Sequence, residues 1–158
     1  MAYTDYEFYK SKFYGDTVPE SDFLKYAERA SDRIDKYTFD RLVDGLPENE
    51  RAKTKVQKAV CAVADEMYKI DQVRNALMDN IGTIKREDGT VINKTVSSVS
   101  SGNESISYVT GNNAFANNKY VELASDPKKE NEHYLTKAVE FLFNVTDDNG
   151  IHLLYAGD

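Results

Sequence analysis

The segment 19–42, PESDFLKYAERASDRIDKYTFDRL, decides the fold class of this chain. Apolar side chains recur in it at intervals of three and four residues, the spacing of one face of an α-helix. They are Phe23, Tyr26, Ala27, Ala30, Ile34 and Tyr37. The opposite face is charged, with Lys25, Glu28, Arg29, Asp32 and Asp35. The segment therefore predicts an amphipathic helix of about 18 residues with one buried face.

Signals at both ends support this helix. Thr17 and Glu20 have the spacing of a capping box, and Pro19 suits a first helical turn. The turn sequence DGLP, 44–47, follows the helix. Upstream, the aromatic residues of segment 1–16 recur at helical spacing and predict a second, short amphipathic helix. We expect Gly15 and Asp16 to end it.

A long helix is predicted from about 48 to 80. Its apolar stripe consists of Val56, Ala59, Val60, Val63, Ala64, Met67, Ile70 and Leu77. Cys61 lies just off the stripe, so we expect a half-buried hydrophobic residue rather than a nucleophile. A single cysteine also excludes an internal disulfide.

The last predicted helix is ENEHYLTKAVEFLFNV, 130–145. It has two apolar stripes: Leu135, Ala138, Val139 and Leu142, and Tyr134, Phe141 and Val145. Two stripes favour either a central core helix or a helix that a partner also covers. We expect His133 on its surface. The predicted common core is Ile34, Val60, Val63, Met67 and Leu142.

Between the long helices the pattern changes. Asp88-Gly89 and Gly102-Asn103 are turn signals between β-prone flanks, and SSGNESISYVTG, 100–111, alternates as a strand does. This ribbon is either an interface element or a mobile surface loop. The Asn-rich stretch 111–132 allows one more short helix around AFANNKYVELA.

The C-terminal segment IHLLYAGD, 151–158, is short and apolar and includes His152. Its position makes it hard to bury locally, so we expect it to dock on a partner. The competing interpretation is that it folds back and caps the core of its own chain. Melting of a chain without these residues would separate the two.

Composition limits the function classes. The chain has 158 residues, 41% hydrophobic and 30% charged, with a net charge of −7. Its acidity argues against gripping DNA phosphates and leaves either a solvated acidic surface or one that repels DNA. The longest strongly apolar run, AVCAVA at 59–64, is too short to cross a membrane, and no signal peptide is expected.

No motif indicates catalysis. His133 and His152 lie in different segments without metal-ligand spacing, and phosphate-binding glycine motifs and HExxH are absent from the sequence. We therefore expect no catalytic residues, no metal and no cofactor, and a protein that is not an enzyme.

The order of AERASDRIDKYTF, KAVCAVADEMY, SSGNESIS and LLYAG resembles the head–tail connector (adaptor, or head-completion) proteins of tailed bacteriophages, notably those from low-GC Gram-positive hosts. The similarity covers residues 3–110 best. It implies a mainly α fold in a single connector domain, residues 1–158. A small helical bundle, 1–80 and 131–146, would have a hairpin or loop insertion, 81–130, with the β-hairpin at about 82–111, and an extended tail, 147–158.

The same resemblance implies a structural role in the virion, at the head–tail interface, and a location in the cytoplasm of the bacterial host before assembly. About twelve copies would form a ring between the portal protein and the stopper or tail proteins, without membrane contact. With one helix about 10 Å wide from each copy, the ring would leave a hole of about 28 Å. Double-stranded DNA would pass through it without specific binding. The implied contacts to the portal or the next subunit are Ser101, Gly102, Ile106, Tyr108, Ile151, Leu153, Leu154 and Tyr155.

Two alternatives remain. One is another head–tail joining component, a stopper or tail-terminator, which would be richer in β-structure. The other is a small helical regulatory module encoded by a mobile element, against which the acidity and the missing basic recognition helix argue.

Overall fold

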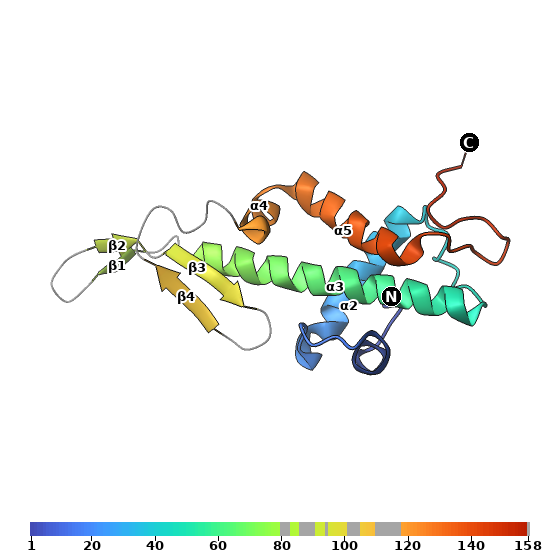
Figure 1. Ribbon diagram of the computed structural model, residues 1–158, viewed down its shortest axis with the longest axis horizontal. Coiled ribbons are helices and arrows are strands. Elements are labelled where there is room, and N and C mark those ends of the chain that lie inside the picture. The colour runs from blue at the N-terminus through green and yellow to red at the C-terminus, as the bar shows by residue number, and fades with distance from the viewer. Residues whose placement is uncertain (80–82, 86–90, 94, 101–104, 110–117, 158) are drawn as a thin grey trace. The chain divides into compact units, whose positions relative to one another are not determined.

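The computed structural model describes residues 1–79, 83–85, 91–93, 95–100, 105–109 and 118–157, and from 79 to 109 it describes the backbone only (Figure 1). Its helical elements are α1 (Tyr6–Phe8), the π-helical turn η1 (Tyr9–Phe13), α2 (Glu20–Tyr37), α3 (Glu50–Asp79), α4 (Lys119–Ser125) and α5 (Pro127–Leu142). The predicted mainly α class is confirmed. The chain forms two compact units, Met1–Tyr68 with Asn131–Asp158, and Lys69–Glu130.

Helix α2 is the amphipathic helix that the sequence predicts, and it is 18 residues long. All six residues of its predicted apolar stripe are buried. The predicted capping box is wrong, because Pro19 occupies the N-cap position and makes no side-chain cap bond. Thr17 lies outside the helix, where its N–H donates to the Tyr9 hydroxyl at 3.0 Å. The Pro19 carbonyl accepts instead from the N–H of Phe23 at 3.0 Å.

The N-terminal segment is helical, as predicted, but it ends differently. The Asp5 carboxylate caps α1 by accepting from the Phe8 N–H at 2.8 Å. The left-handed residue that ends η1 is Tyr14, with φ 60°, rather than Gly15. Gly15 is required for another reason: a Cβ there would overlap the ring of buried Tyr9. The tight turn after η1 therefore depends on the close approach of backbone to ring.

Helix α3 provides more buried apolar residues than any other described element. Asn49 precedes it and accepts from the N–H groups of Arg51 and Ala52 at 3.0 and 3.1 Å. The predicted core residues Ile34, Val60, Val63, Met67 and Leu142 are all buried. Cys61 is fully buried, so the expectation of half-burial is wrong: the neighbouring N-terminal segment covers that side of α3, and Cys61 Sγ lies 3.8 Å from Thr4 Oγ1.

Helix α5 begins three residues before its predicted start. Asp126 caps it, accepting from the Lys128 N–H at 2.9 Å. His133 is not the surface residue that the sequence predicts, because its side chain is only 8% exposed and its Nε2 lies 2.5 Å from Glu66 Oε2 of α3. Buried Tyr134, Ala138 and Leu142 agree with a core helix, whereas Leu135 is 37% exposed.

Among its described residues, the second compact unit has four short strands. Strand β1 (Thr83–Lys85) pairs antiparallel with β2 (Val91–Asn93), and β3 (Thr95–Ser100) with β4 (Ser105–Val109). The predicted turn pairs Asp88-Gly89 and Gly102-Asn103 lie outside the described residues.

In the helical part of this unit, Arg74 Nη2 bonds Glu130 Oε2 at 2.9 Å and Arg74 Nη1 bonds Asp71 Oδ1 at 2.8 Å. Asn118 caps α4 by accepting from the Tyr120 N–H at 3.0 Å. Within the unit, the Arg74–Glu130 pair joins α3 to α5, and an ion pair of Lys129 with Glu122 joins α5 to α4.

Candidate assembly surface

The C-terminal tail is anchored on its own chain through Leu153. This side chain is fully buried, and its N–H donates to the Val145 carbonyl at 2.9 Å. Leu142, the last residue of α5, and Val145, three residues after it, are buried too. The expectation that the tail is hard to bury locally is therefore wrong for Leu153, because Val145 after α5 provides a backbone partner that brings this residue back to the buried part of its own chain. The competing interpretation, a tail that caps its own core, holds for this residue.

A tight turn leads into the tail. The Asp147 carboxylate accepts from the N–H groups of Asn149 and Ile151 at 2.9 and 2.8 Å. Gly150 has φ 78°, the left-handed conformation that glycine adopts without strain. Asp148 Oδ1 accepts from the Glu48 N–H at 2.9 Å and so ties the turn to the loop before α3.

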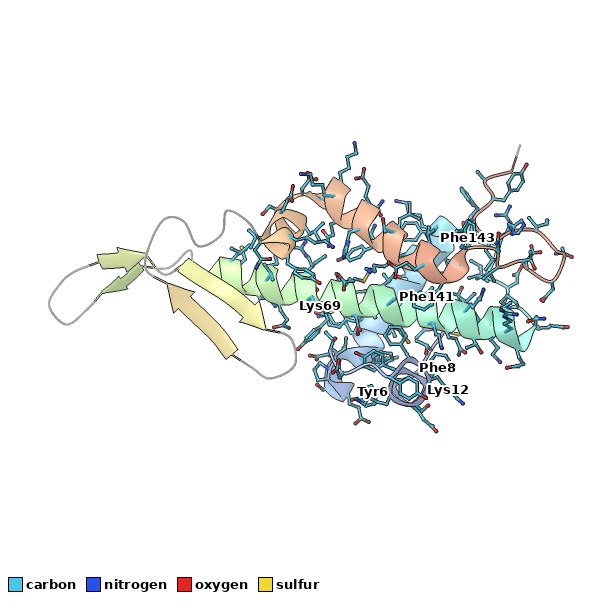
Figure 2. All side chains as sticks on the ribbon, viewed as in Figure 1. Tyr6, Phe8, Lys12, Lys69, Phe141 and Phe143 are labelled. Atoms are coloured by element: carbon cyan, nitrogen blue, oxygen red, sulfur yellow. The ribbon has the colours of Figure 1, made fainter. Side chains whose placement is uncertain are left out.

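Arg41 joins this tail to the loop after α2. Its Nη1 donates to the Tyr155 carbonyl at 2.6 Å, and its guanidinium lies 5.7 Å from the centre of the Phe39 ring. Four large apolar side chains of the loop after α2 and of the tail from residue 147 onward stay exposed: Phe39 at 50%, Val43 at 63%, Ile151 at 42% and Tyr155 at 48%. We call these four the loop–tail surface. In Figure 2, the loop after α2 and the C-terminal tail lie together beyond the end of α5.

The residues predicted as contacts differ in exposure, and several lie outside the described part of the chain. Ile151 and Tyr155 are exposed, Leu154 is half-buried and Leu153 is buried. Ser101 and Gly102 lie outside the described residues. Ile106 and Tyr108 belong to β4, where the side chains are likewise outside the description.

Sequence reasoning missed Phe39 and Val43. Phe39 follows Thr38, the C-cap residue of α2, and has φ 55°, a left-handed conformation that is rare and strained for a bulky residue. No pattern predicts this, because helices end in that conformation most often at glycine. The Asp40 N–H donates to the Asp35 carbonyl at 2.9 Å and closes the helix end around Phe39. The strained turn holds the Phe39 ring half in solvent.

The charged side chains of this region are mainly acidic. Segments 38–50 and 143–157 hold six carboxylates and, among lysines and arginines, only Arg41, which gives a net charge of −5. The carboxylates are those of Asp40, Asp44, Glu48, Glu50, Asp147 and Asp148. An open hollow of about 550 Å³ adjoins the loop, lined in part by Val43, Leu46 and Pro47, by three of these acids, and by Lys53 and Met1. The loop–tail surface is thus apolar with an acidic border.

The buried titratable groups serve the fold. Tyr9 Oη donates to Asp65 Oδ1 at 2.6 Å, and Tyr3 Oη donates to Asp35 Oδ1 at 2.6 Å. Burial raises the pKa of both phenols, and it raises the pKa of the Asp35 carboxyl and that of the Cys61 thiol, the latter to about 12. A thiol held in its neutral form is a poor nucleophile at neutral pH. Within the described ranges, no three His, Cys, Asp or Glu side chains are grouped so that they could hold a metal ion.

Comparison with known proteins gives no relatives: no family model, no curated protein and no solved structure matches the chain. No described helix combines the length and the hydrophobicity that crossing a membrane requires.

Proposed function

We propose that this protein is a structural component of the head–tail connector of a tailed bacteriophage. Copies of it form a ring between the portal and the stopper or tail, extend the DNA channel and complete the head after packaging. The ordered sequence segments described above suggest this function, and the mainly helical fold agrees with the adaptor class better than with the β-rich stoppers and tail-terminators.

The observation that carries the proposal is that the C-terminal tail has one buried anchor residue between two exposed apolar residues. Leu153 is fully buried and fixes the tail, while Ile151 and Tyr155, two residues away on either side, are about half exposed. A fixed backbone presents these apolar side chains at little entropic cost on binding. Exposed apolar clusters on small proteins mark interaction sites. An assembly protein needs such a surface, and the −5 charge around it selects partners of opposite sign.

Binding to purified portal protein tests the proposal. The full-length chain and portal rings are mixed, separated by sedimentation and weighed by native mass spectrometry. We expect a complex in which several copies of the chain bind one portal ring. The matched variants Tyr155→Ala and Leu24→Ala each remove an exposed apolar side chain, and only the former should weaken binding. Failure of the wild-type chain to bind the portal protein of its own phage would contradict the proposal.

The regulatory-module alternative predicts affinity for nucleic acid. A gel-shift series with double-stranded DNA at low salt distinguishes the two functions, because an acidic channel protein has little affinity at any salt concentration. A shifted band of protein–DNA complex that disappears when salt is added would favour the alternative.

A further inference from the structure

The first half of helix α3 has a run of positive charge. Segment 51–64, RAKTKVQKAVCAVA, contains one arginine, three lysines and no carboxylate, in a chain whose net charge is −7. Arg51, Lys55 and Lys58 follow one another at intervals of four and three residues, which places them on one face of the helix. Arg51 is exposed, and Lys55 and Lys58 are half-buried. We call these three residues the α3 basic face.

The α3 basic face lies between the two elements that pack on either side of this helix. At about 100° of turn per residue, its three positions fall between those of Cys61 and Glu66. Cys61 contacts Thr4 of the N-terminal segment, and Glu66 contacts His133 of α5. In Figure 1, α5 and the N-terminal segment lie on opposite sides of α3. The basic face is therefore a strip of α3 that these two neighbours leave accessible.

The basic face has no partner within the described part of the chain. Its three side chains make no ion pair or hydrogen bond with any residue that the structure describes. Neighbouring carboxylates of α3 and of the N-terminal segment are engaged in other contacts. They are Glu50, which lies 3.8 Å from Lys53 Nζ, Asp65, which accepts from Tyr9 Oη at 2.6 Å, Glu66, whose Oε2 lies 2.5 Å from His133 Nε2, and Asp5, which caps α1.

The arrangement is unfavourable for the helix itself. Like charges three and four residues apart on a helix repel each other. Cations near the N-terminus of a helix also oppose the positive end of its dipole, and Arg51 is the second residue of α3. Lys137 of α5 shows the favourable pattern, because it pairs with Glu140 three residues later at 2.9 Å. A stripe of like charge without such compensation indicates a contact with another molecule.

We propose that the α3 basic face binds an acidic helical segment of a partner protein. Its three cations are separated along the helix axis by about 6 Å and 4.5 Å. Carboxylates one turn apart on a second helix have the same spacing, and charged pairs along two packed helices determine which partner binds and in which orientation. The basic face is separate from the loop–tail surface, and this proposal does not depend on portal binding.

The charges around the basic face favour a short acidic segment over a nucleic acid. The acidic loop–tail region, with its net charge of −5, ends at Glu50, directly before Arg51. Asp65 follows about two turns after Lys58. A DNA duplex has continuous phosphate charge and would meet these carboxylates at both ends of the face. A helical segment with a few carboxylates ends before it reaches them.

The first test measures binding of a defined probe to the full-length chain by fluorescence anisotropy. The probe is a labelled alanine-rich helical peptide with glutamates one turn apart on one face, and its control has glutamine at the same positions. The wild type should bind the glutamate peptide more tightly, and added salt should weaken this binding. Equal binding of the two peptides overturns the proposal, as does absence of binding up to a chain concentration of about 1 mM.

Two triple variants locate the binding. Replacing all three basic-face residues with glutamine should weaken binding of the glutamate peptide about tenfold or more. The matched control combines Lys25→Gln, Lys36→Gln and Lys53→Gln, which changes the net charge equally but leaves the basic face intact. It should bind within about twofold of the wild type at physiological salt, because distant charges are screened. Equal weakening in the two variants would mean unspecific attraction and would overturn the proposal.

Thermal melting distinguishes a binding role from a structural one. The basic-face variant should melt at or above the temperature of the wild type, because it removes repulsion between like charges. A lower melting temperature would show that the three cations stabilise the fold and would overturn the proposal.

The remaining occupants are tested with the same basic-face variant. A short DNA duplex that binds the wild type more tightly than the glutamate peptide, and loses this binding in the variant, would assign the face to nucleic acid. Self-association in sedimentation velocity that disappears in the variant would assign it to a second copy of the chain. Either result overturns the proposal. Portal binding is measured separately, so this inference and the proposed function can fail independently.

Discussion

The Tyr9 hydroxyl donates to the Asp65 carboxylate at 2.6 Å and joins the N-terminal segment to α3 across 56 residues of sequence. The same oxygen accepts from the N–H groups of Thr17 and Val18, both at 3.0 Å. One buried atom thus satisfies the carboxylate and fixes the chain before α2. Removing it leaves three polar groups without this partner, which is costly where water has little access.

Tyr9→Phe should therefore lower the free energy of unfolding by about 2 kcal/mol or more. Urea denaturation followed by circular dichroism measures the change. Tyr14→Phe is the matched control, because the Tyr14 side chain is mostly exposed and should change stability by less than about 0.5 kcal/mol. Equal effects of the two substitutions would contradict the assigned role of the Tyr9 hydroxyl.

Gly15→Ala should destabilise the protein by about 1–3 kcal/mol, because the new methyl group overlaps the Tyr9 ring and forces that buried side chain to move. Thermal melting measures the loss. Gly157→Ala provides a comparison: its added methyl group meets no neighbouring atom, although φ 79° strains the backbone there. A larger loss at Gly157 than at Gly15 would show that steric overlap with Tyr9 is not the cause.

Leu153→Ala should lower the free energy of unfolding by about 2–5 kcal/mol, since it empties a fully buried site. Tyr155→Ala, two residues further on and about half exposed, should cost much less and act on assembly instead. Chemical denaturation of both variants measures the difference. If Leu153→Ala left stability unchanged, the tail would not be part of the core.

Ile34→Ala on the buried face of α2 should cost about 2–5 kcal/mol, whereas Leu24→Ala on the exposed face of the same helix should cost less than about 0.5 kcal/mol. Ile34 is fully buried and Leu24 is 63% exposed. The two midpoints of urea denaturation provide the comparison. Similar losses at both positions would mean that the faces of α2 are assigned wrongly.

Cys61 should resist thiol reagents in the folded chain at pH 8 and react fully in urea, because burial raises the pKa of its thiol to about 12. The sign of the pH effect follows. A group whose pKa is raised on folding contributes its stability below the unfolded pKa, near 9.0, and loses it as the pH rises to about 12. Stability should fall across that window, with the buried phenols of Tyr3 and Tyr9 adding to the fall.

Cys61→Ala separates the contribution of the thiol from that of the two phenols. In this variant, the loss of stability at alkaline pH should be smaller by the part that the thiol causes, and the part that the phenols cause should remain. Denaturation midpoints at a series of pH values provide the data. Rapid labelling of the native wild type would contradict the burial of Cys61.

The sequence determined the helices, because helical spacing of apolar residues is a local pattern: the stripe from Phe23 to Tyr37 predicts which face of α2 is buried, and the structure agrees. Helix ends were less predictable. Thr17 matches a capping box but lies outside α2, since its N–H is bound by Tyr9 from a neighbouring segment. Competition from a tertiary contact overrode a local signal.

Only the tertiary structure decided the roles of His133, Leu153 and Phe39. His133 meets Glu66 across 67 residues of sequence, and Leu153 reaches the core only because a turn brings the tail back to Val145. Phe39 is held outward by a left-handed backbone that its residue type does not indicate. Burial and exposure at such positions depend on which distant segment arrives beside them, and periodicity along one helix has no information about that encounter.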